Sequence, residues 1–421
     1  MKKEILLIIY CCVCIFSSAQ KKVIIDGREE SIYILHSPVT SDPAGAAALQ
    51  QLLGSKKIVG LGEATHGTRE FYQLKTELLQ FLITRCGFRS VIFEGPVGGM
   101  LHINDYVLTD AGNIDSLLQR TGYWMYYTPE IRSFFTWLQA YNSGRPSTEK
   151  VSVFGMDMQS GQDIAEYLFA KNRLLPEQQQ QSFRSLISQA SQPAELSAIL
   201  VLLNGWLDSN RALISHVYTP EMSALYALCL KNIDYATRAA KSGEYFRDSC
   251  MAANVTDLVN LTGHKTAVWA HNGHIGMYDS AVSYSSLLKP MGELLKKEFK
   301  EQYYPIGFLF SEGSFAALEK KKRDNDFYYP WLKAFELKPA AANRLAQLLS
   351  PVSDEAFFID ISASDHPLWK QYQKVYTVGA TYTRKGNNTF YLTPAAVFKG
   401  LVFIRKTTAV SQLDDHFYIM K

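Results

Sequence analysis

The residues with the clearest potential for chemistry lie in a polar turn that follows a short apolar run. Residues 57–61 (KIVGL) are aliphatic and partly β-branched, and Glu63, His66 and Arg69 follow them in a glycine-flanked turn. A helical pattern begins directly afterwards. Charged and imidazole groups are costly to bury without partners, so we expect these side chains to meet water or a ligand. A strand that ends in such a turn is typical of the carboxyl edge of an α/β sheet, where ligands bind.

Three more apolar runs end in residues of the same kinds. They are followed by Glu94, by Asp157, and by the pair His271 and His274. If these runs are parallel strands, their ends lie at one edge of the sheet, and the four residues line one crevice together with the first turn. Asp157 has an alternative role, because an aspartate after a strand is often the N-cap of the next helix.

A histidine beside a carboxylate suits general-base catalysis. The charge of histidine changes near neutral pH, and Glu63 or Glu94 beside His66 would fix the tautomer of the ring and raise its basicity. Such a base can deprotonate water, which contributes roughly 10²–10⁴-fold to a rate. The sequence has no G-x-S-x-G motif and no cysteine near these residues, so we expect water as the nucleophile.

Attack of water on a carbonyl produces an oxyanion that needs hydrogen-bond donors. We expect His271 or His274, together with Arg69, to bind it. The same side chains leave a second interpretation open, since histidine and glutamate are good ligands for zinc or manganese. A divalent metal would then be held by His66, His271 and His274, although the sequence lacks H-E-x-x-H. A third interpretation is a non-catalytic protein that binds a metal or haem through these histidines. We expect no cofactor unless such a metal is present.

The elements that must position these residues alternate along the chain. The predicted strands span residues 57–61, 90–94, 151–156, 266–270, 304–310, 356–361, 375–382 and 397–404, and the predicted helices span residues 43–53, 68–86, 98–108, 129–141, 163–174 and 247–261. This alternation predicts an α/β fold with a mostly parallel central sheet flanked by helices. Residues from about 172 to 262 contain helical periodicity without a convincing strand. We interpret them as an α-helical insertion that caps the edge of the sheet.

Composition and the N-terminal segment limit the classes of function. The 421 residues are 47% hydrophobic with a net charge of +3, which gives no indication of nucleic-acid binding. Residues 1–19 combine two lysines, an apolar run and small residues before Gln20, a pattern typical of a signal peptide. We therefore expect a secreted or periplasmic monomer, with residues 20–421 as one domain and no membrane span after cleavage. Cys229 and Cys250 could pair, but buried free thiols fit better.

The motifs together resemble a known family. The residues that carry the resemblance are Gly62–Phe71 with Lys75, Phe93–Pro96, Phe154–Asp157, Trp269–His274 and the aromatic stretch that begins at Tyr123-Trp124. In order and spacing they are similar to the erythromycin esterase family. The resemblance implies an α/β fold with a helical cap over a deep cleft. It also implies hydrolysis of a macrolide lactone by activated water, and a role in antibiotic resistance.

The resemblance assigns roles to individual residues. It implies that His66 is the general base, that Glu63 and Glu94 support it, and that His271 and His274 complete the site with Arg69 nearby. Aromatic residues near the cleft suit a large, mostly apolar substrate. The residues expected to contact an ester or macrolide are Lys75, Trp124, Tyr127 and Asp157.

Overall fold

The computed structural model describes residues 20–171, 175–187, 193–239, 242, 244–278, 289–323, 326–328, 332–338, 343–383 and 388–414. The predicted signal peptide lies outside these residues and stays a prediction. Among the described helices, none combines the length and the apolar character that a membrane crossing requires.

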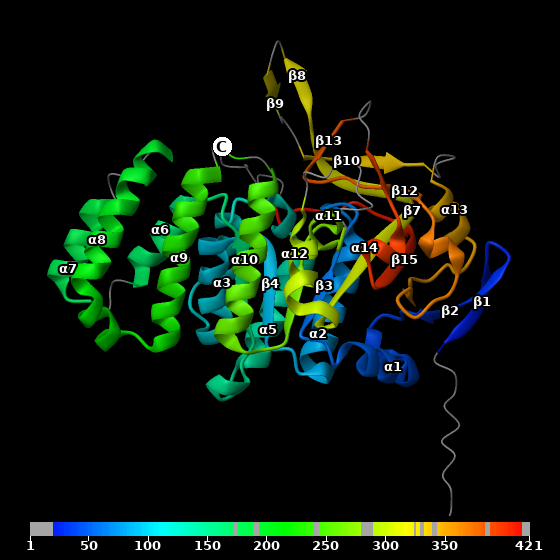
Figure 1. Ribbon diagram of the computed structural model, residues 1–421, viewed down its shortest axis with the longest axis horizontal. Helices are drawn as coiled ribbons and strands as arrows, with labels where there is room; N and C mark the ends of the chain where they lie inside the picture. Colours follow the sequence, from blue (N-terminus) through cyan, green and yellow to red (C-terminus); the bar gives the residue numbers. More distant parts are fainter. Residues whose placement is uncertain are drawn as a thin grey trace, which may run out of the picture.

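The fold is α/β, as the sequence predicts, with a large mixed sheet at its centre (Figure 1). Nine strands follow one path, and β10 (Leu332–Leu337) and β13 (Thr381–Tyr382) pair with one of them, β7. In spatial order the nine are β1 (Lys21–Ile25), β2 (Arg28–Ile34), β11 (Phe357–Asp360), β15 (Gly400–Thr407), β7 (Tyr303–Glu319), β3 (Ile58–Leu61), β6 (Thr266–Trp269), β4 (Ser90–Pro96) and β5 (Ser152–Asp157). Two small ladders, β8–β9 (Lys321–Arg323, Asp326–Tyr328) and β12–β14 (Gln373–Tyr376, Thr389–Leu392), lie outside it.

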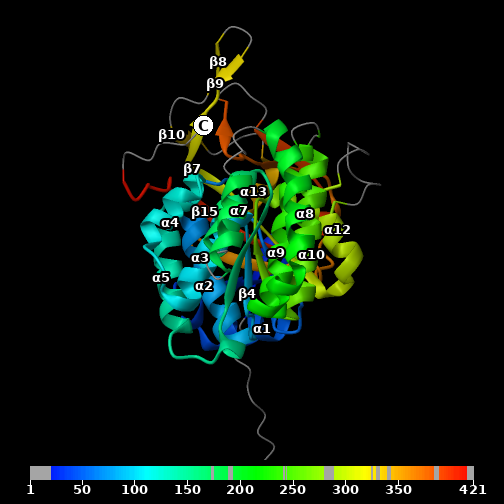
Figure 2. The same cartoon turned by 90° about the vertical axis from the view of Figure 1, so that its left-hand side faces the viewer.

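Helices cover both faces of this sheet. The α-helices of the described residues are α1 (Pro43–Leu53), α2 (Arg69–Cys86), α3 (Val97–Thr109), α4 (Ile114–Arg120), α5 (Pro129–Asn142), α6 (Gly161–Lys171), α7 (Glu177–Ile187), α8 (Pro193–Val217), α9 (Pro220–Ala239), α10 (Glu244–Thr262), α11 (Asn272–Ile275), α12 (Met291–Phe299), α13 (Arg344–Leu349) and α14 (Pro394–Val397). Figure 2 shows α2 and α5 on one side of the strands and α10 and α12 on the other. Each face has its own apolar core, which is why the central strands are apolar along their whole length.

The parallel strands end level with one another. β7, β3, β6, β4 and β5 are parallel neighbours. Leu61 pairs with Trp269, Trp269 with Phe93, and Phe93 with Gly155. The polar residues that follow these positions therefore meet at one edge, which confirms the predicted convergence of the strand ends.

The described residues of the predicted helical insertion, about 172 to 262, form α7, α8, α9 and α10. As a group, α7, α8 and α9 pack against α6 and α10 beside β5, the last strand of the path. In Figure 1 these helices lie beside the strands rather than above their carboxyl ends. α10 differs from them, because it packs on β4 and β5 and brings its first turn to the carboxyl edge.

Two other predictions can be compared with the structure. Residues 375–382 form two strands, β12 and β13, instead of one. The chain leaves the ladder between them because Val378 N donates to Ala64 O, 2.7 Å away, beneath the polar turn. Cys229 and Cys250 are buried free thiols, so the disulfide alternative is wrong.

Candidate active site

The polar turn after β3 is fixed by close contact with its neighbours. A Cβ on Gly62 would lie 2.1 Å from Asn272 Oδ1, and a Cβ on Gly67 would lie 2.0 Å from Ala316 O. Only glycine allows these approaches. The carbonyl of Gly67 also accepts a hydrogen bond of 2.8 Å from Ala316 N. The turn therefore has one position relative to β7 and α11, and so do the side chains that it carries.

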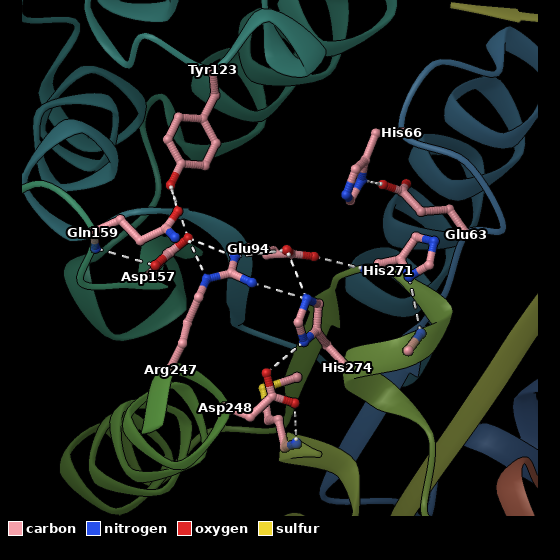
Figure 3. A network of polar contacts seen from close by, with 12 residues as sticks. Glu63, His66, Glu94, Tyr123, Asp157, Gln159, Arg247, Asp248, His271 and His274 are labelled. Carbon is pink, nitrogen blue, oxygen red and sulfur yellow. Dashed lines mark hydrogen bonds and ion pairs between the residues drawn. The ribbon is translucent and has the colours of Figure 1, made fainter. Parts of the chain in front are cut away.

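Glu63 and His66 form a buried pair within this turn (Figure 3). His66 Nδ1 and Glu63 Oε1 are 2.6 Å apart. The other oxygen, Oε2, accepts hydrogen bonds from Lys75 Nζ at 2.7 Å and from Trp269 Nε1 at 3.0 Å. Burial alone would raise the pKa of Glu63, but Lys75 and His66 outweigh it, so that the pKa lies below its usual value. Glu63 is therefore the ionised carboxylate that orients His66.

This pair defines the tautomer of His66. An ionised carboxylate can only accept, so Nδ1 carries the proton and Nε2 carries a lone pair. Among the described residues, none makes a hydrogen bond to Nε2. A lone pair held in a fixed ring, with a carboxylate behind it, is the arrangement of a general base.

His271 lies beside His66 as a neutral donor. Their ring centroids are 5.1 Å apart. His271 Nδ1 accepts a hydrogen bond of 3.1 Å from Gly273 N, and burial lowers the pKa of His271 to about 3. The ring is thus uncharged with its proton on Nε2, which lies 3.2 Å from Thr377 Oγ1 and 3.4 Å from Ala64 O. Nε2–H is a donor that an oxyanion can use.

His274 is held between two carboxylates. Its Nδ1 lies 2.7 Å from Asp248 Oδ1 and its Nε2 lies 3.2 Å from Glu94 Oε1. Burial alone would lower the pKa of His274, but Glu94 and Asp248 outweigh it and raise the pKa to about 10. Nε2 of His274 also lies 3.0 Å from Arg247 Nη1, which can only donate. His274 therefore joins Asp248 on one side to Glu94 and Arg247 on the other, and its role is to hold Glu94 in place.

Glu94 and Asp157 share a third partner, Arg247 on α10 (Figure 3). The Nη2 of Arg247 lies 2.9 Å from Glu94 Oε1 and 2.7 Å from Asp157 Oδ2. Asp157 Oδ2 also accepts a hydrogen bond of 2.8 Å from Tyr123 OH. The second oxygen of Glu94 accepts one of 2.9 Å from the backbone of His271. The network thus connects the ends of β4, β5 and β6 and fixes the backbone position of His271.

The structure joins seven of the predicted residues, Lys75 among them, and leaves Arg69, Trp124 and Tyr127 outside the network. The other six are Glu63, His66, Glu94, Asp157, His271 and His274. Lys75 is fully buried against Glu63, so it orients the carboxylate and has no surface to offer a substrate. Trp124 and Tyr127 are buried in the first core. Arg69 is 55% exposed and pairs with Glu130 at 3.1 Å. Direct contacts of Trp124, Tyr127 and Arg69 with a substrate stay predictions.

Sequence reasoning missed Arg247 and Asp248. Both lie within the first five residues of α10, which precedes β6. A helix that precedes a parallel strand runs opposite to it, so its N-terminus lies at the carboxyl edge of the sheet. A charged pair at the start of this helix could therefore have indicated that both residues belong to the site.

The raised pKa of His274 leads to a prediction for how stability depends on pH. A folded-state pKa near 10, above the usual 6.5, means that the contribution of His274 is complete below about pH 6.5 and is lost as the pH rises toward 10. We expect the urea midpoint of wild type to fall over this range, and the fall to be smaller in His274→Gln. His264→Gln, which changes a histidine outside the network, should keep the wild-type slope. Equal slopes in wild type and His274→Gln would contradict the raised pKa.

The ring nitrogens do not suit a metal site formed by the three histidines. Nδ1 of His274 faces Asp248, and its Nε2 faces both Glu94 and Arg247. Nδ1 of His271 faces the N–H of Gly273. In the described part of the chain, no group of three or more histidine, cysteine, aspartate or glutamate residues is arranged to hold a metal ion. A metal at His66, His271 and His274 would require His274 to give up at least one carboxylate.

Three comparisons connect this geometry with known proteins. A family model described as Erythromycin esterase matches residues 83–407, beginning after the turn of His66. Erythromycin esterase type II of Escherichia coli is 32% identical over 111 residues, which are 26% of this chain and 25% of that relative. The aligned part thus spans only about a quarter of that relative.

Two solved structures have similar folds. A succinoglycan biosynthesis protein has a TM-score of 0.72 and 21% identity, over 91% of this chain and 96% of its own. A mutant of the erythromycin esterase EreC in its open conformation has a TM-score of 0.63 and 17% identity, over 90% of this chain and 97% of its own. At these identities the two structures establish the fold alone.

Proposed function

Because this chain belongs to the erythromycin esterase family, a family of hydrolases, we propose that it cleaves a carboxylic ester or lactone with a water molecule activated by His66. The substrate class we propose is a macrolide-type ring, and opening such a ring would give the protein a role in antibiotic resistance. The observation that carries the proposal is the pair of neighbouring rings with opposite roles. His66 has a lone pair on Nε2, and His271, 5.1 Å away between centroids, has a proton on Nε2.

The reaction follows from these two nitrogens. His66 Nε2 takes a proton from water while the water oxygen attacks the carbonyl carbon. The oxyanion that forms accepts a hydrogen bond from His271 Nε2–H. When the tetrahedral intermediate collapses, the carbon–alkoxy bond breaks and His66 returns its proton to the leaving oxygen. The products are a carboxylic acid and an alcohol, and a lactone gains one water as its ring opens.

The remaining residues act through these two. Glu63 stabilises the imidazolium that His66 becomes, and Lys75 and Trp269 hold Glu63. Glu94 accepts a hydrogen bond of 2.9 Å from the backbone N–H of His271 and so fixes the position of that residue. Donors that are already in position before the reaction are worth more than donors that must reorganise during it. These buried networks favour such preorganisation.

A metal-dependent hydrolase is the second candidate, and a non-catalytic metal- or haem-binding protein is the third. The engaged nitrogens of His271 and His274 favour the metal-free reaction over both. We expect the rate of ester hydrolysis to stay within about twofold after treatment with EDTA, and zinc or manganese to restore nothing. A panel of esters and lactones, followed by mass spectrometry with and without EDTA, measures this. Activity that EDTA abolishes and zinc restores would establish the second candidate. Bound metal or haem without turnover of any ester would establish the third.

A further inference from the structure

A cavity of about 270 Å³ lies beside His271 and His274. Its other walls come from Tyr278, from Pro290 before α12, and from the small ladder β12–β14. None of the roles described above uses these walls. The cavity is nevertheless continuous with the donors of the site, because Thr377, which lies 3.2 Å from His271 Nε2, lines it as well.

The walls away from the histidines are mostly apolar, and Lys289 is the charged residue among them. Val375 and Leu392 are buried hydrophobic residues, and Phe390 meets Tyr278 edge to face at 5.6 Å between ring centroids. Side chains alternate along β14, so that Phe390 and Leu392 line the cavity whereas Tyr391 between them does not. The cavity is thus polar at its histidine end and mostly apolar along its body.

The size of the cavity limits its occupant. An apolar cavity of roughly 150 Å³ binds benzene, so about 270 Å³ suits a group nearly twice as large, such as a chain of roughly eight carbons. Sites that enclose a whole drug-sized ligand are about 300–1,000 Å³. This cavity therefore holds one apolar part of a large substrate, or the chain of a smaller ester.

The position of His66 in the proposed reaction determines which part of the substrate occupies the cavity. The leaving alkoxy oxygen must stay within reach of His66, which returns a proton to it, and His66 does not line the cavity. The acyl chain is bonded to the same carbonyl carbon as the leaving oxygen and extends away from that oxygen. We propose that the cavity is the acyl subsite and binds an apolar acyl group of up to roughly eight carbons, with its carbonyl oxygen on His271 Nε2. This assignment rests on the proposed function.

The test compares two neighbouring aromatic residues that are similarly exposed. Phe390 is 42% exposed and lines the cavity, whereas Tyr391 is 48% exposed and stacks on Tyr372 outside it. We expect the ratio of kcat/KM for p-nitrophenyl octanoate over p-nitrophenyl acetate to fall about tenfold or more in Phe390→Ala. The ratio should stay within about twofold in Tyr391→Ala. Val375→Trp, which fills the cavity, should lower the ratio further, and thermal unfolding shows that each variant is folded.

A binding measurement separates failure of the subsite from failure of the reaction. Octanoate should bind to wild type and Tyr391→Ala in calorimetry and should not bind to Val375→Trp. This pattern without hydrolysis of any ester would support the subsite and overturn only the proposed function. Equal octanoate affinity and equal chain-length ratios in all folded variants would overturn the subsite, even if p-nitrophenyl acetate is hydrolysed. A Phe390→Ala effect on the length of the alcohol in acetate esters, and not on the acyl chain, would overturn the acyl assignment.

Discussion

Replacing His66 with glutamine is expected to lower kcat for ester hydrolysis about 10²–10⁴-fold, the usual contribution of a general base. Glutamine has a similar length and can still donate to Glu63 from its amide, but it has no basic nitrogen at the position of Nε2. Because Glu63 keeps a donor partner, the loss should appear in kcat without a large change in stability. Steady-state kinetics on any ester that wild type hydrolyses, with thermal unfolding alongside, measures both.

The control for this substitution is Glu63→Gln. Its amide can present N–H to His66 Nδ1, which would move the ring proton to Nε2 and remove the base while keeping the histidine. A loss of the same order as in His66→Gln is expected. If His66→Gln kept more than a tenth of the wild-type kcat, or if Glu63→Gln were fully active, His66 would not be the base.

Replacing Arg247 with methionine is expected to lower the free energy of unfolding by about 3–5 kcal/mol, the usual cost of leaving a buried charge without its partner. The guanidinium is largely buried and contacts both Glu94 and Asp157 within 2.9 Å. It also helps to hold the pKa of Glu94 well below its usual range: burial alone would raise that pKa, but His274 and Arg247 outweigh it. Urea denaturation of wild type and Arg247→Met measures the difference.

Two variants make this result interpretable. Arg344→Met removes an arginine that pairs with Asp26 at 2.8 Å but is 60% exposed, and exposed pairs are worth about 0–1 kcal/mol. Arg247→Met combined with Asp157→Asn removes the charge of one of the two carboxylates that lose Arg247, so part of the loss should be recovered. A change in Arg247→Met no larger than in Arg344→Met would show that the network does not stabilise the fold.

The convergence of the site could be predicted because it depends on sheet topology. Apolar runs that alternate with helices imply parallel strands, and parallel strands bring Glu63, Glu94, Asp157 and His271 to one edge. The spacing of apolar residues along the chain is enough to predict this convergence. It also predicts the bounds of α1, because the predicted range of residues 43–53 and the observed helix agree.

The division of roles within the site could not be predicted. Whether Glu63 or Glu94 contacts His66 depends on side-chain directions at the edge, and only the 2.6 Å contact of Glu63 decides it. The charges of His271 and His274 depend on partners that are far away in sequence, such as Asp248. Spacing alone made the two histidines look equivalent, although the pKa of His271 is lowered to about 3 and that of His274 is raised to about 10.

Some features that the sequence analysis missed could have been predicted from the sequence. The hairpin β1–β2 turns at Asp26-Gly27, whose φ values are 47° and 76°, and Asp-Gly is a strong signal for such a turn. The acyl subsite, in contrast, depends on the tertiary position of β12–β14 against Tyr278. The aromatic residues expected near the cleft, such as Trp124 and Tyr127, are buried in the first core, and their contact with a substrate stays a prediction.

The most direct test of the central claim is mass spectrometry of erythromycin incubated in ¹⁸O-labelled water with purified wild type and, in parallel, with His66→Gln. We predict that erythromycin gains one water with wild type, that the label lies in the new carboxylate, and that His66→Gln gives almost no product. Unchanged erythromycin together with an unchanged panel of simpler esters and lactones would contradict the account, and so would equal product from both proteins.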